Sequence, residues 1–191
     1  QLREFVSTYM DESEDYGLIP GTQKKTLYKP GAEKLCDVYG LPARYEDVAR
    51  VERWEDPAFF HYELRCLLIS RRDGSVMGEG RGSCNSREDH YRWRTAKPAC
   101  PECGFELRLA KERSEWYCWA KKGGCGAKYR GDMFRFERVE NEDPFTLVNT
   151  FIKMAKKRAL VDAVLSVTRS SGLLTQDLED REDGVIDIGK A

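Results

Sequence analysis

The sequence predicts an α+β fold in which an antiparallel β-meander packs on a long C-terminal helix and a small four-cysteine module is inserted. Three observations support this prediction. Residues 59–84 contain two strand-like runs around an Asp-Gly turn, residues 145–170 carry apolar side chains at helical spacing, and four of the seven cysteines gather in residues 100–125. Consecutive strands followed by a helix favour an antiparallel sheet that the helix covers.

The chain divides into segments of different composition. Residues 1–24 predict an N-terminal arm that is partly helical or loose and has an acidic end. The expected α+β core comprises residues 25–94 and 132–175. Residues 95–131 interrupt it as the inserted module, and residues 176–191 predict an acidic tail without fixed structure.

The core begins with a helix expected at residues 31–39. Pro30 fits its first turn, and Gly40 fits the position just after its end. Four apolar residues recur at the spacing of one helix face: Ala32, Leu35, Cys36 and Tyr39.

Strands should follow this helix. The expected strands are 43–54, 59–70 and 75–84, with a returning strand at 133–139. Between them, residues 85–92 predict a short helix capped by Asn85 or Ser86.

The longest element is a helix expected at residues 145–170, with Gly172 closing it. A stripe of small and branched side chains runs along it: Val148, Ile152, Ala155, Ala159, Ala163 and Val167. We expect this stripe to bring the helix close to the sheet.

The overall charge limits the classes of function. A formal net charge of -1 argues against a polycation that coats nucleic acid, although acidic and basic residues are segregated along the chain. No stretch approaches the roughly 20 apolar residues that span a membrane, and the N-terminus lacks a signal-peptide pattern. We expect no membrane partner and a cytoplasmic, nucleoid-associated location.

The inserted module carries the clearest motif. Its cysteines are Cys100, Cys103, Cys118 and Cys125. A C-x-x-C pair lets one turn aim two thiolates at a single ion, and glycines around the second pair make its wider spacing feasible. With short strands expected at 105–109 and 116–119, this predicts a zinc ribbon. Because four thiolates would fill the coordination sphere, the zinc ion would be structural.

Other interpretations of these four cysteines are possible besides a zinc site. The four could form two disulfides or stay free, whereas a redox C-x-x-C lacks the strand-then-helix context it needs. A zinc ribbon can bind nucleic acid, bind protein or stiffen a loop, and the sequence does not choose among these. Cys36, Cys66 and Cys84 are expected to be buried reduced thiols.

Two basic clusters suggest a nucleic-acid partner. Lys153, Lys156, Lys157 and Arg158 lie beside the apolar stripe, and no acidic residue occurs between Asp143 and Asp162 to pair with them. The second cluster mixes cations and rings that suit phosphates and bases: Arg81, Arg87, Tyr91, Arg92, Trp93 and Arg94, with His90 among them. Glu88 and Asp89 are the only opposing charges expected there.

Two further patterns favour structural roles. Gly78, Gly80 and Gly82 recur at period two on one strand face, which favours close packing over contact with nucleic acid. A hydrolytic metal cluster could form from acidic residues around residues 46–56, but a solvated acidic loop fits better: Glu46, Asp47, Glu52, Glu55 and Asp56. The chain has no H-E-x-x-H, G-x-S-x-G or P-loop motif, so we predict no enzymatic activity.

Residues 28–35, residues 149–165 and Thr175-Gln-Asp-Leu178 resemble poorly characterised proteins of bacteria, phages and mobile elements. The helix–meander–helix order resembles the single-strand annealing superfamily, which includes the eukaryotic recombination mediator and the phage Erf and Sak types. This resemblance implies a groove between meander and basic helix, protomers joined side by side, and single-stranded DNA held with its bases exposed.

The resemblance places the four cations of residues 153–158 on the family's basic helix, Arg71 and Arg72 on the hairpin, and Arg81 on the groove strand. The inserted ribbon departs from the family pattern. We therefore predict a non-enzymatic, zinc-stabilised strand-annealing protein of recombination or repair. Single-stranded DNA is the favoured partner, with RNA a second, and homo-oligomers as rings or filaments are expected. The alternatives are a protein adaptor using ribbon and tail, and a metal-dependent nuclease.

Overall fold

The computed structural model describes residues 2–19, 24–110 and 114–176. The fold comprises two units, a large unit of Gln1–Ser86 with Phe145–Ala191 and a small unit of Arg87–Pro144. Antiparallel sheets and a long C-terminal helix match the predicted α+β class. The predicted acidic tail lies outside the described residues, apart from Gln176.

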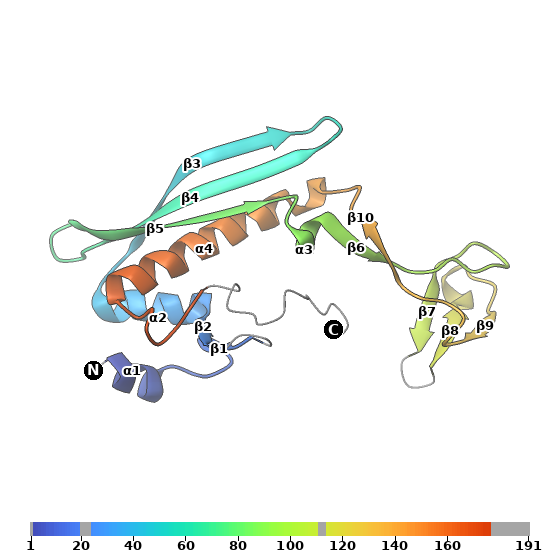
Figure 1. The fold of residues 1–191 in the computed structure, drawn as a ribbon, viewed down its shortest axis with the longest axis horizontal. Helices are drawn as coiled ribbons and strands as arrows, with labels where there is room; N and C mark the ends of the chain where they lie inside the picture. The colour runs from blue at the N-terminus through green and yellow to red at the C-terminus, as the bar shows by residue number, and fades with distance from the viewer. Residues whose placement is uncertain (1, 20–23, 111–113, 177–191) are drawn as a thin grey trace. The chain divides into compact units, whose positions relative to one another are not determined.

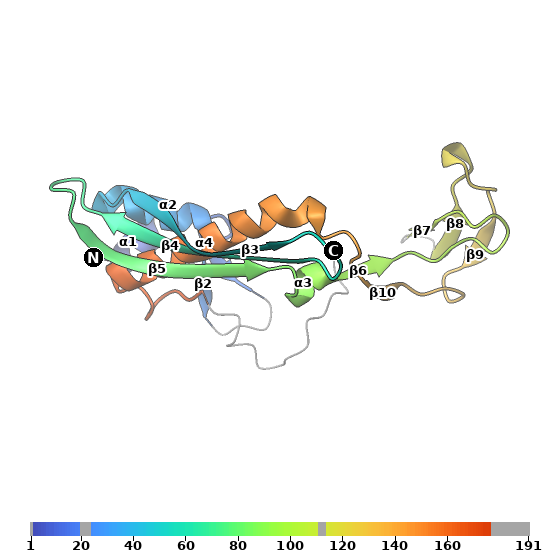
Figure 2. The ribbon, with the colours of Figure 1, turned by 90° about the horizontal axis from the view of Figure 1, so that it is seen from above.

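The large unit is built around a three-stranded antiparallel sheet in the order β3-β4-β5. Helix α4 runs along one face of this sheet (Figures 1 and 2). The elements of the unit are α1 (Leu2–Tyr9), β1 (Tyr16–Leu18), β2 (Lys25–Leu27), α2 (Lys29–Tyr39), β3 (Ala43–Arg53), β4 (Phe59–Ile69), β5 (Val76–Asn85), η3 (Phe145–Leu147) and α4 (Val148–Thr168). All three predicted strands and both main helices are present, with ends shifted by a few residues.

Alternation along β4 explains why the sheet has a buried and an exposed face. Phe60, Tyr62, Leu64 and Cys66 are buried at every second position, and the residues between them are partly exposed. Phe151 of α4 lies against the ring of Phe60, with their centroids 6.4 Å apart. The core of the large unit therefore lies between this face and α4.

Helix α4 approaches the sheet closely because β5 presents glycines to it. A Cβ atom on Gly80 would lie 2.1 Å from the backbone nitrogen of Ala163, and one on Gly82 would lie 2.2 Å from that of Ala159. These distances exclude any side chain on β5 at these positions. The packing interpretation of the glycine pattern is confirmed.

The N-terminal segment is held more firmly than its sequence indicates. Strands β1 and β2 pair, and β2 also exchanges backbone hydrogen bonds with Thr175. The predicted arm is partly helical, as α1 shows, but Asp15 at its acidic end is only 1% exposed and accepts a 2.6 Å hydrogen bond from Lys34 of α2. The sequence did not indicate this burial, because a carboxylate is normally exposed unless a partner distant in sequence neutralises it.

The small unit contains two separate small sheets. Its elements are α3 (Asp89–Arg92), β6 (Trp93–Ala96), β7 (Leu107–Ala110), β8 (Glu115–Cys118), η2 (Ala120–Lys122), β9 (Lys128–Arg130) and β10 (Glu137–Glu140). Strand β10 pairs with β6, and the other sheet has the order β7-β8-β9. The expected returning strand at 133–139 therefore pairs outside the main sheet, and this unit extends beyond residues 95–131 on both sides.

Two predicted helix boundaries are wrong. Helix α4 ends at Thr168, and Arg169, not Gly172, takes the left-handed conformation with φ 54°. Helix α3 has only four residues, and its expected cap Ser86 instead accepts a hydrogen bond from the backbone N–H of Phe60. At α3, the hydrogen bond from distant Phe60 engages the Ser86 hydroxyl and outweighs its local capping preference.

No helix among the described residues is long and apolar enough to cross a membrane.

Candidate metal site and nucleic-acid interface

The four predicted cysteines converge on one point of the small unit. The Sγ atoms of Cys100, Cys103, Cys118 and Cys125 all lie within 4.8 Å of one another. Cys100 and Cys125 are 3.6 Å apart, and Cys103 and Cys118 are 3.5 Å apart. A tetrahedral Zn²⁺ site with Zn–S bonds of about 2.3 Å separates its sulfur atoms by about 3.8 Å, so this donor set fits such an ion.

Local backbone geometry brings the two pairs together. The first pair closes a turn in which the Gly104 amide donates to the Cys100 carbonyl, and Gly104 has φ 74°. In the second pair a Cβ atom on Gly124 would lie 2.4 Å from the Cys118 Sγ atom. Only glycine leaves space for the sulfur there, which explains how six residues can separate these two ligands.

The electrostatics of the cluster favour a bound cation. Burial opposes ionisation of Cys100, but hydrogen bonds from the Tyr129 hydroxyl and the amides of Glu102 and Cys103 lower its pKa to about 6. The Ala127 amide favours a thiolate at Cys125, but burial and hydrogen bonds among the thiols raise its pKa to about 12. One thiolate thus suppresses ionisation of its neighbours, a conflict that a divalent cation would remove.

A small apolar core supports the cluster. Trp116 is 1% exposed, and its indole Nε1 donates a 3.1 Å hydrogen bond to the Gly131 carbonyl. Leu107 and the cysteines Cys100 and Cys118 are also buried, and Phe134 packs against them. This is a small core, so the module depends on additional stabilisation at the cysteines.

The lysines predicted on α4 are arranged as a strip along one flank of the helix. Lys153 and Lys156 are exposed, and Lys157 is half-buried. None of the ion pairs formed by the described residues involves these three lysines. Their charges are therefore uncompensated within that part of the chain. We call these three residues the α4 lysines.

Arg158 belongs to the other flank of α4. Its guanidinium donates a hydrogen bond to the carbonyl of Ser83 on β5. It therefore anchors the helix to the sheet edge and does not extend the strip of α4 lysines. The sequence could not reveal this contact, because its partner Ser83 lies 75 residues away along the chain.

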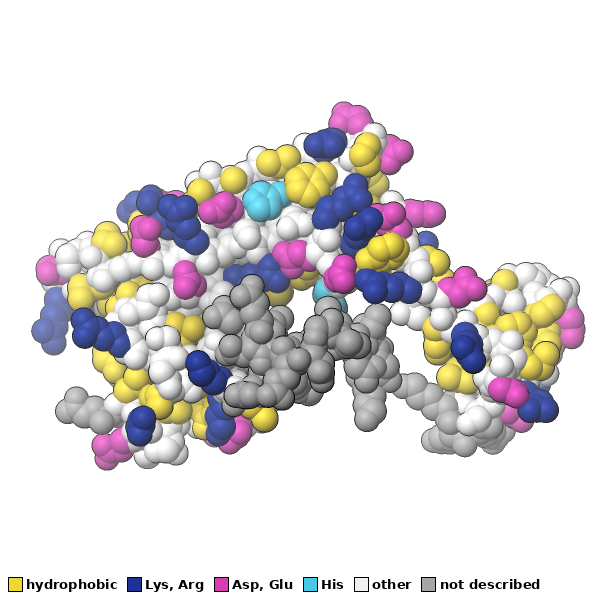
Figure 3. Space-filling view, in the orientation of Figure 1, with side chains coloured by type: hydrophobic (Ala, Val, Ile, Leu, Met, Phe, Trp, Pro, Cys, Tyr) yellow, Lys and Arg dark blue, Asp and Glu magenta, His cyan; other side chains and the backbone are white. Residues whose placement is uncertain are grey.

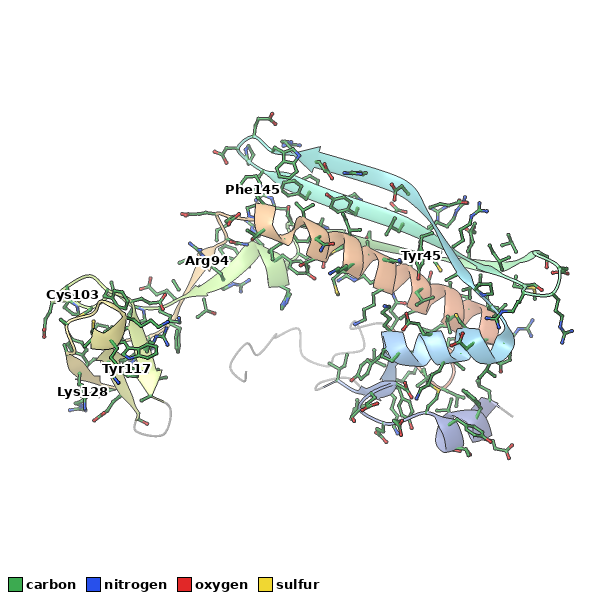
Figure 4. All side chains as sticks on the ribbon, turned by 180° about the vertical axis from the view of Figure 1, so that it is seen from behind. Tyr45, Arg94, Cys103, Tyr117, Lys128 and Phe145 are labelled. Atoms are coloured by element: carbon green, nitrogen blue, oxygen red, sulfur yellow. The ribbon has the colours of Figure 1, made fainter. Side chains whose placement is uncertain are left out.

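Aromatic residues that the sequence did not single out accompany the strip. The Lys156 ammonium lies 4.4 Å from the centroid of the Tyr45 ring, which projects from β3 toward α4 (Figure 4). At the N-terminal end of α4, Trp54 and Phe145 stack with centroids 5.8 Å apart, and both are substantially exposed at 52% and 40%. Tyr45 lies opposite Cys66 in the β3–β4 register, so strand alternation was the signal that could have placed it on this face.

The second predicted cluster is largely neutralised. Arg87 and Arg92 both form ion pairs with Glu140 at 3.2 and 3.1 Å, and Arg94 lies 3.9 Å from Glu142. The expectation that Glu88 and Asp89 are the only opposing charges is therefore wrong. The cause is the pairing of β10 with β6, which brings distant carboxylates beside these arginines.

The aromatic members of that cluster are also engaged. Tyr91 is buried, with 8% exposure. The Trp93 ring contacts two guanidinium groups, with its centroid 4.9 Å from Arg92 and 4.8 Å from Arg138. Neither ring is presented freely, so this segment stabilises the small unit.

Arginines on the outer face of the main sheet are embedded in a charge network. Arg65 contacts Glu46 at 2.6 Å and Glu79 at 3.5 Å, while Arg81 lies 3.7 Å from Glu63. Figure 3 shows basic and acidic side chains side by side over this sheet. The face is therefore close to electrically balanced, and Arg81 is not a free cation.

Arg71 and Arg72 lie in the exposed turn between β4 and β5. Neither joins an ion pair with another described residue. The nearby start of β5 faces the C-terminal part of α4, since a Cβ on Gly78 would meet Val167. The α4 lysines lie more than two helical turns earlier, so the structure does not bring the two groups together.

The acidic residues considered for metal-dependent hydrolysis do not gather. Glu46 pairs with Arg44 and Arg65, and Glu52 accepts hydrogen bonds from Tyr62 and Arg50. These contacts lower the pKa of both carboxyl groups; for Glu52 the Tyr62 hydroxyl is the main cause. Among the described residues, the only group of His, Cys, Asp and Glu arranged to hold a metal ion is the four cysteines.

In comparisons with known proteins, the chain matches no family model, no curated protein and no solved structure.

Proposed function

We propose that this protein binds single-stranded nucleic acid, with DNA as the favoured substrate, and promotes pairing of complementary strands. The observation that carries this proposal is the strip of α4 lysines, which lacks carboxylate partners among the described residues and lies beside the ring of Tyr45. Cations beside an aromatic ring suit a flexible polyanion whose bases are unpaired.

Each part of this surface has a separate role in the proposal. Lys153, Lys156 and Lys157 would neutralise phosphates, which supplies affinity without sequence preference. The exposed Trp54–Phe145 pair would offer a stacking platform for a base at the end of the strip. A surface that binds the phosphates leaves the base edges accessible, and annealing requires accessible base edges for pairing with a second strand.

The cysteine cluster has a structural role in this proposal. A Zn²⁺ ion held by Cys100, Cys103, Cys118 and Cys125 would complete a zinc ribbon and stabilise the small unit. Four protein ligands leave no coordination position for water or substrate, so no reaction step is assigned to the ion. Side-by-side assembly of protomers, implied by the annealing resemblance, would align lysine strips along one strand.

Binding to a fluorescent single-stranded oligonucleotide tests the proposal. The variant Lys153→Gln/Lys156→Gln/Lys157→Gln should lose much of the wild-type affinity, and the slope of log K against log salt should fall by about 2 to 3. The matched control is Lys25→Gln/Lys29→Gln/Lys97→Gln, which removes three lysines already paired with Glu12, Glu33 and Glu106.

Annealing and assembly need their own measurements. Wild type should accelerate pairing of two complementary labelled strands, and the α4 variant should not. Mass measurement in solution, with and without a short strand, reports assembly. A wild-type protein that stays monomeric and does not bind the strand would remove the proposal.

A further inference from the structure

We propose that the outer face of the β7-β8-β9 sheet is a second contact surface for single-stranded nucleic acid, centred on Tyr117. This inference rests on the proposed function for the class of ligand, but it uses a separate surface in the small unit. Its residues are Arg108, Tyr117, Trp119, Lys122 and Lys128. We call this set the ribbon face.

Strand register places the cations around the ring. Tyr117 on β8 lies opposite Arg108 of β7 on one side and Lys128 of β9 on the other. The Cβ atoms of directly opposed residues in an antiparallel sheet lie about 5 Å apart, so the side chains of Arg108 and Lys128 leave the sheet about 10 Å apart, with Tyr117 between them. Figure 4 shows Tyr117 and Lys128 together on this module.

The opposite face of the same sheet packs into the core of the module. Trp116 and Cys118 alternate with Tyr117 and Trp119 along the chain, and the first two are buried at 1% and 2% exposure. Tyr117 and Trp119 are half-buried, and neither is part of the core below the cysteines. The core therefore does not explain why a module this small carries two large rings on its outer face.

The cations of the ribbon face lack acidic partners among the described residues. None of the ion pairs there involves Arg108, Lys122 or Lys128. Instead, Arg108 and Lys122 lie over the Trp119 ring, at 4.2 and 5.4 Å from its centroid. A cation held by a ring keeps its charge available to a phosphate, which an ion pair would not.

These features favour a single strand over an acidic protein surface. Carboxylates would satisfy the three cations but would leave the ring of Tyr117 unused, since it joins no ring pair among the described residues. A nucleotide offers a phosphate and a flat base together, which matches cations flanking an aromatic ring. The ribbon face would bind without sequence preference, because neither type of contact reads base edges.

The experiment compares oligonucleotide binding by full-length, zinc-loaded variants. Arg108→Gln/Lys128→Gln should weaken binding and reduce the salt slope by about 1 to 2. Tyr117→Leu should weaken binding about tenfold on a normal strand and have little effect on an abasic strand of equal length. The control is Lys97→Gln/Arg130→Gln, whose cations are paired with Glu106 and Asp132 in the same unit. Metal content verifies that each variant keeps its folded module.

The outcomes separate this inference from the proposed function. Wild-type affinity and salt slope in Arg108→Gln/Lys128→Gln would overturn the ribbon face and leave the α4 lysines in place. Loss of binding in that variant with no loss in the α4 lysine variant would support the ribbon face and overturn the assignment of α4. An equal effect of Tyr117→Leu on normal and abasic strands would overturn base stacking. A wild-type protein that binds no single strand overturns both proposals.

Discussion

Gly82 of β5 lies against Ala159 of α4 with no space for a side chain between them, since a Cβ on Gly82 would be 2.2 Å from the Ala159 backbone nitrogen. Gly80 makes the same kind of approach to Ala163. The helix therefore rests almost directly on the strand backbone. This short distance sets how closely α4 packs on β5.

Replacing Gly80 should strongly destabilise the large unit. In Gly80→Ala the new methyl group would overlap backbone atoms of Ala163, which cannot rotate away as a side chain can. We expect the free energy of unfolding to fall by about 2 kcal/mol or more, measured by urea denaturation.

Gly172→Ala is the matched control for that substitution. A Cβ on Gly172 would meet nothing within 4 Å, so we expect a change within about 0.5 kcal/mol. Equal stability of Gly80→Ala and Gly172→Ala would mean that the helix does not rest on β5 in solution.

Much of the large unit could be predicted because local signals agreed with its tertiary structure. The alternation of buried and partly exposed residues in β4 is visible in the sequence of that strand alone. The same holds for Gly40, the left-handed residue that ends α2. The burial of Asp15 could not be predicted, because its partner Lys34 is nineteen residues away and only the fold of β1 and α2 joins them. Long-range pairing also explains why β10 was assigned to the wrong sheet.

The two parts of the candidate site differ in how far sequence could locate them. Cysteine spacing alone identified the cluster, since a C-x-x-C turn brings its ligands together by local geometry. The basic residues could not be sorted by local reasoning, because neutralisation depends on which carboxylates the fold brings near. In the sequence only Glu88 and Asp89 are near Arg87, but the fold brings the distant Glu140 to 3.2 Å from it, whereas none of the ion pairs among the described residues involves Lys153.

Replacing Lys34 should lower the thermal stability of the large unit, because Asp15 is a buried carboxylate. The Asp15 carboxylate is 1% exposed and receives hydrogen bonds from the Lys34 ammonium at 2.6 Å and the Asp11 amide at 2.8 Å. In Lys34→Met the buried carboxylate loses its cation, so we expect Tm to fall by roughly 5 °C in a thermal scan.

Lys29→Met is the control on the same helix. Lys29 pairs with Glu33 at 3.1 Å, but both side chains are more than half exposed. Surface pairs of this kind contribute little, so Tm should move by about 1 °C or less. If both variants had the same Tm, the contact between Lys34 and Asp15 would contribute nothing to stability.

Chelating the metal should unfold the small unit and leave the large unit folded. The core beneath the four cysteines is small, so we expect β7, β8 and β9 to depend on a bound ion for their stability. With excess chelator we expect amide protection to be lost across the small unit and kept across β4 and α4, as measured by hydrogen exchange.

Metal content provides the specific check on that expectation. Cys103→Ala should abolish stoichiometric zinc binding, whereas Cys84→Ala, a buried cysteine of β5, should retain one ion per chain. Retention of zinc by Cys103→Ala would contradict the four-cysteine site. Uniform loss of protection over both units would show that they unfold together.

Alkaline pH should weaken the large unit through two buried thiols. Burial is the main cause that raises the pKa of both Cys36 and Cys66 to about 11, compared with an ordinary value of 9.0. Between pH 9 and 11 an unfolded chain releases these thiol protons while the folded chain keeps them. Stability contributed by the neutral thiols is therefore complete below pH 9 and declines as pH rises through that window.

Cys36→Ala and Cys66→Ala isolate this effect from other groups that titrate at high pH. Each variant loses packing at every pH, so the informative quantity is the slope of unfolding free energy against pH, obtained from urea denaturation between pH 7.5 and 11. We expect each single variant to show a shallower decline than wild type above pH 9, and the double variant the shallowest. Parallel curves for all four proteins would mean that these thiols ionise equally readily in the folded and unfolded chains.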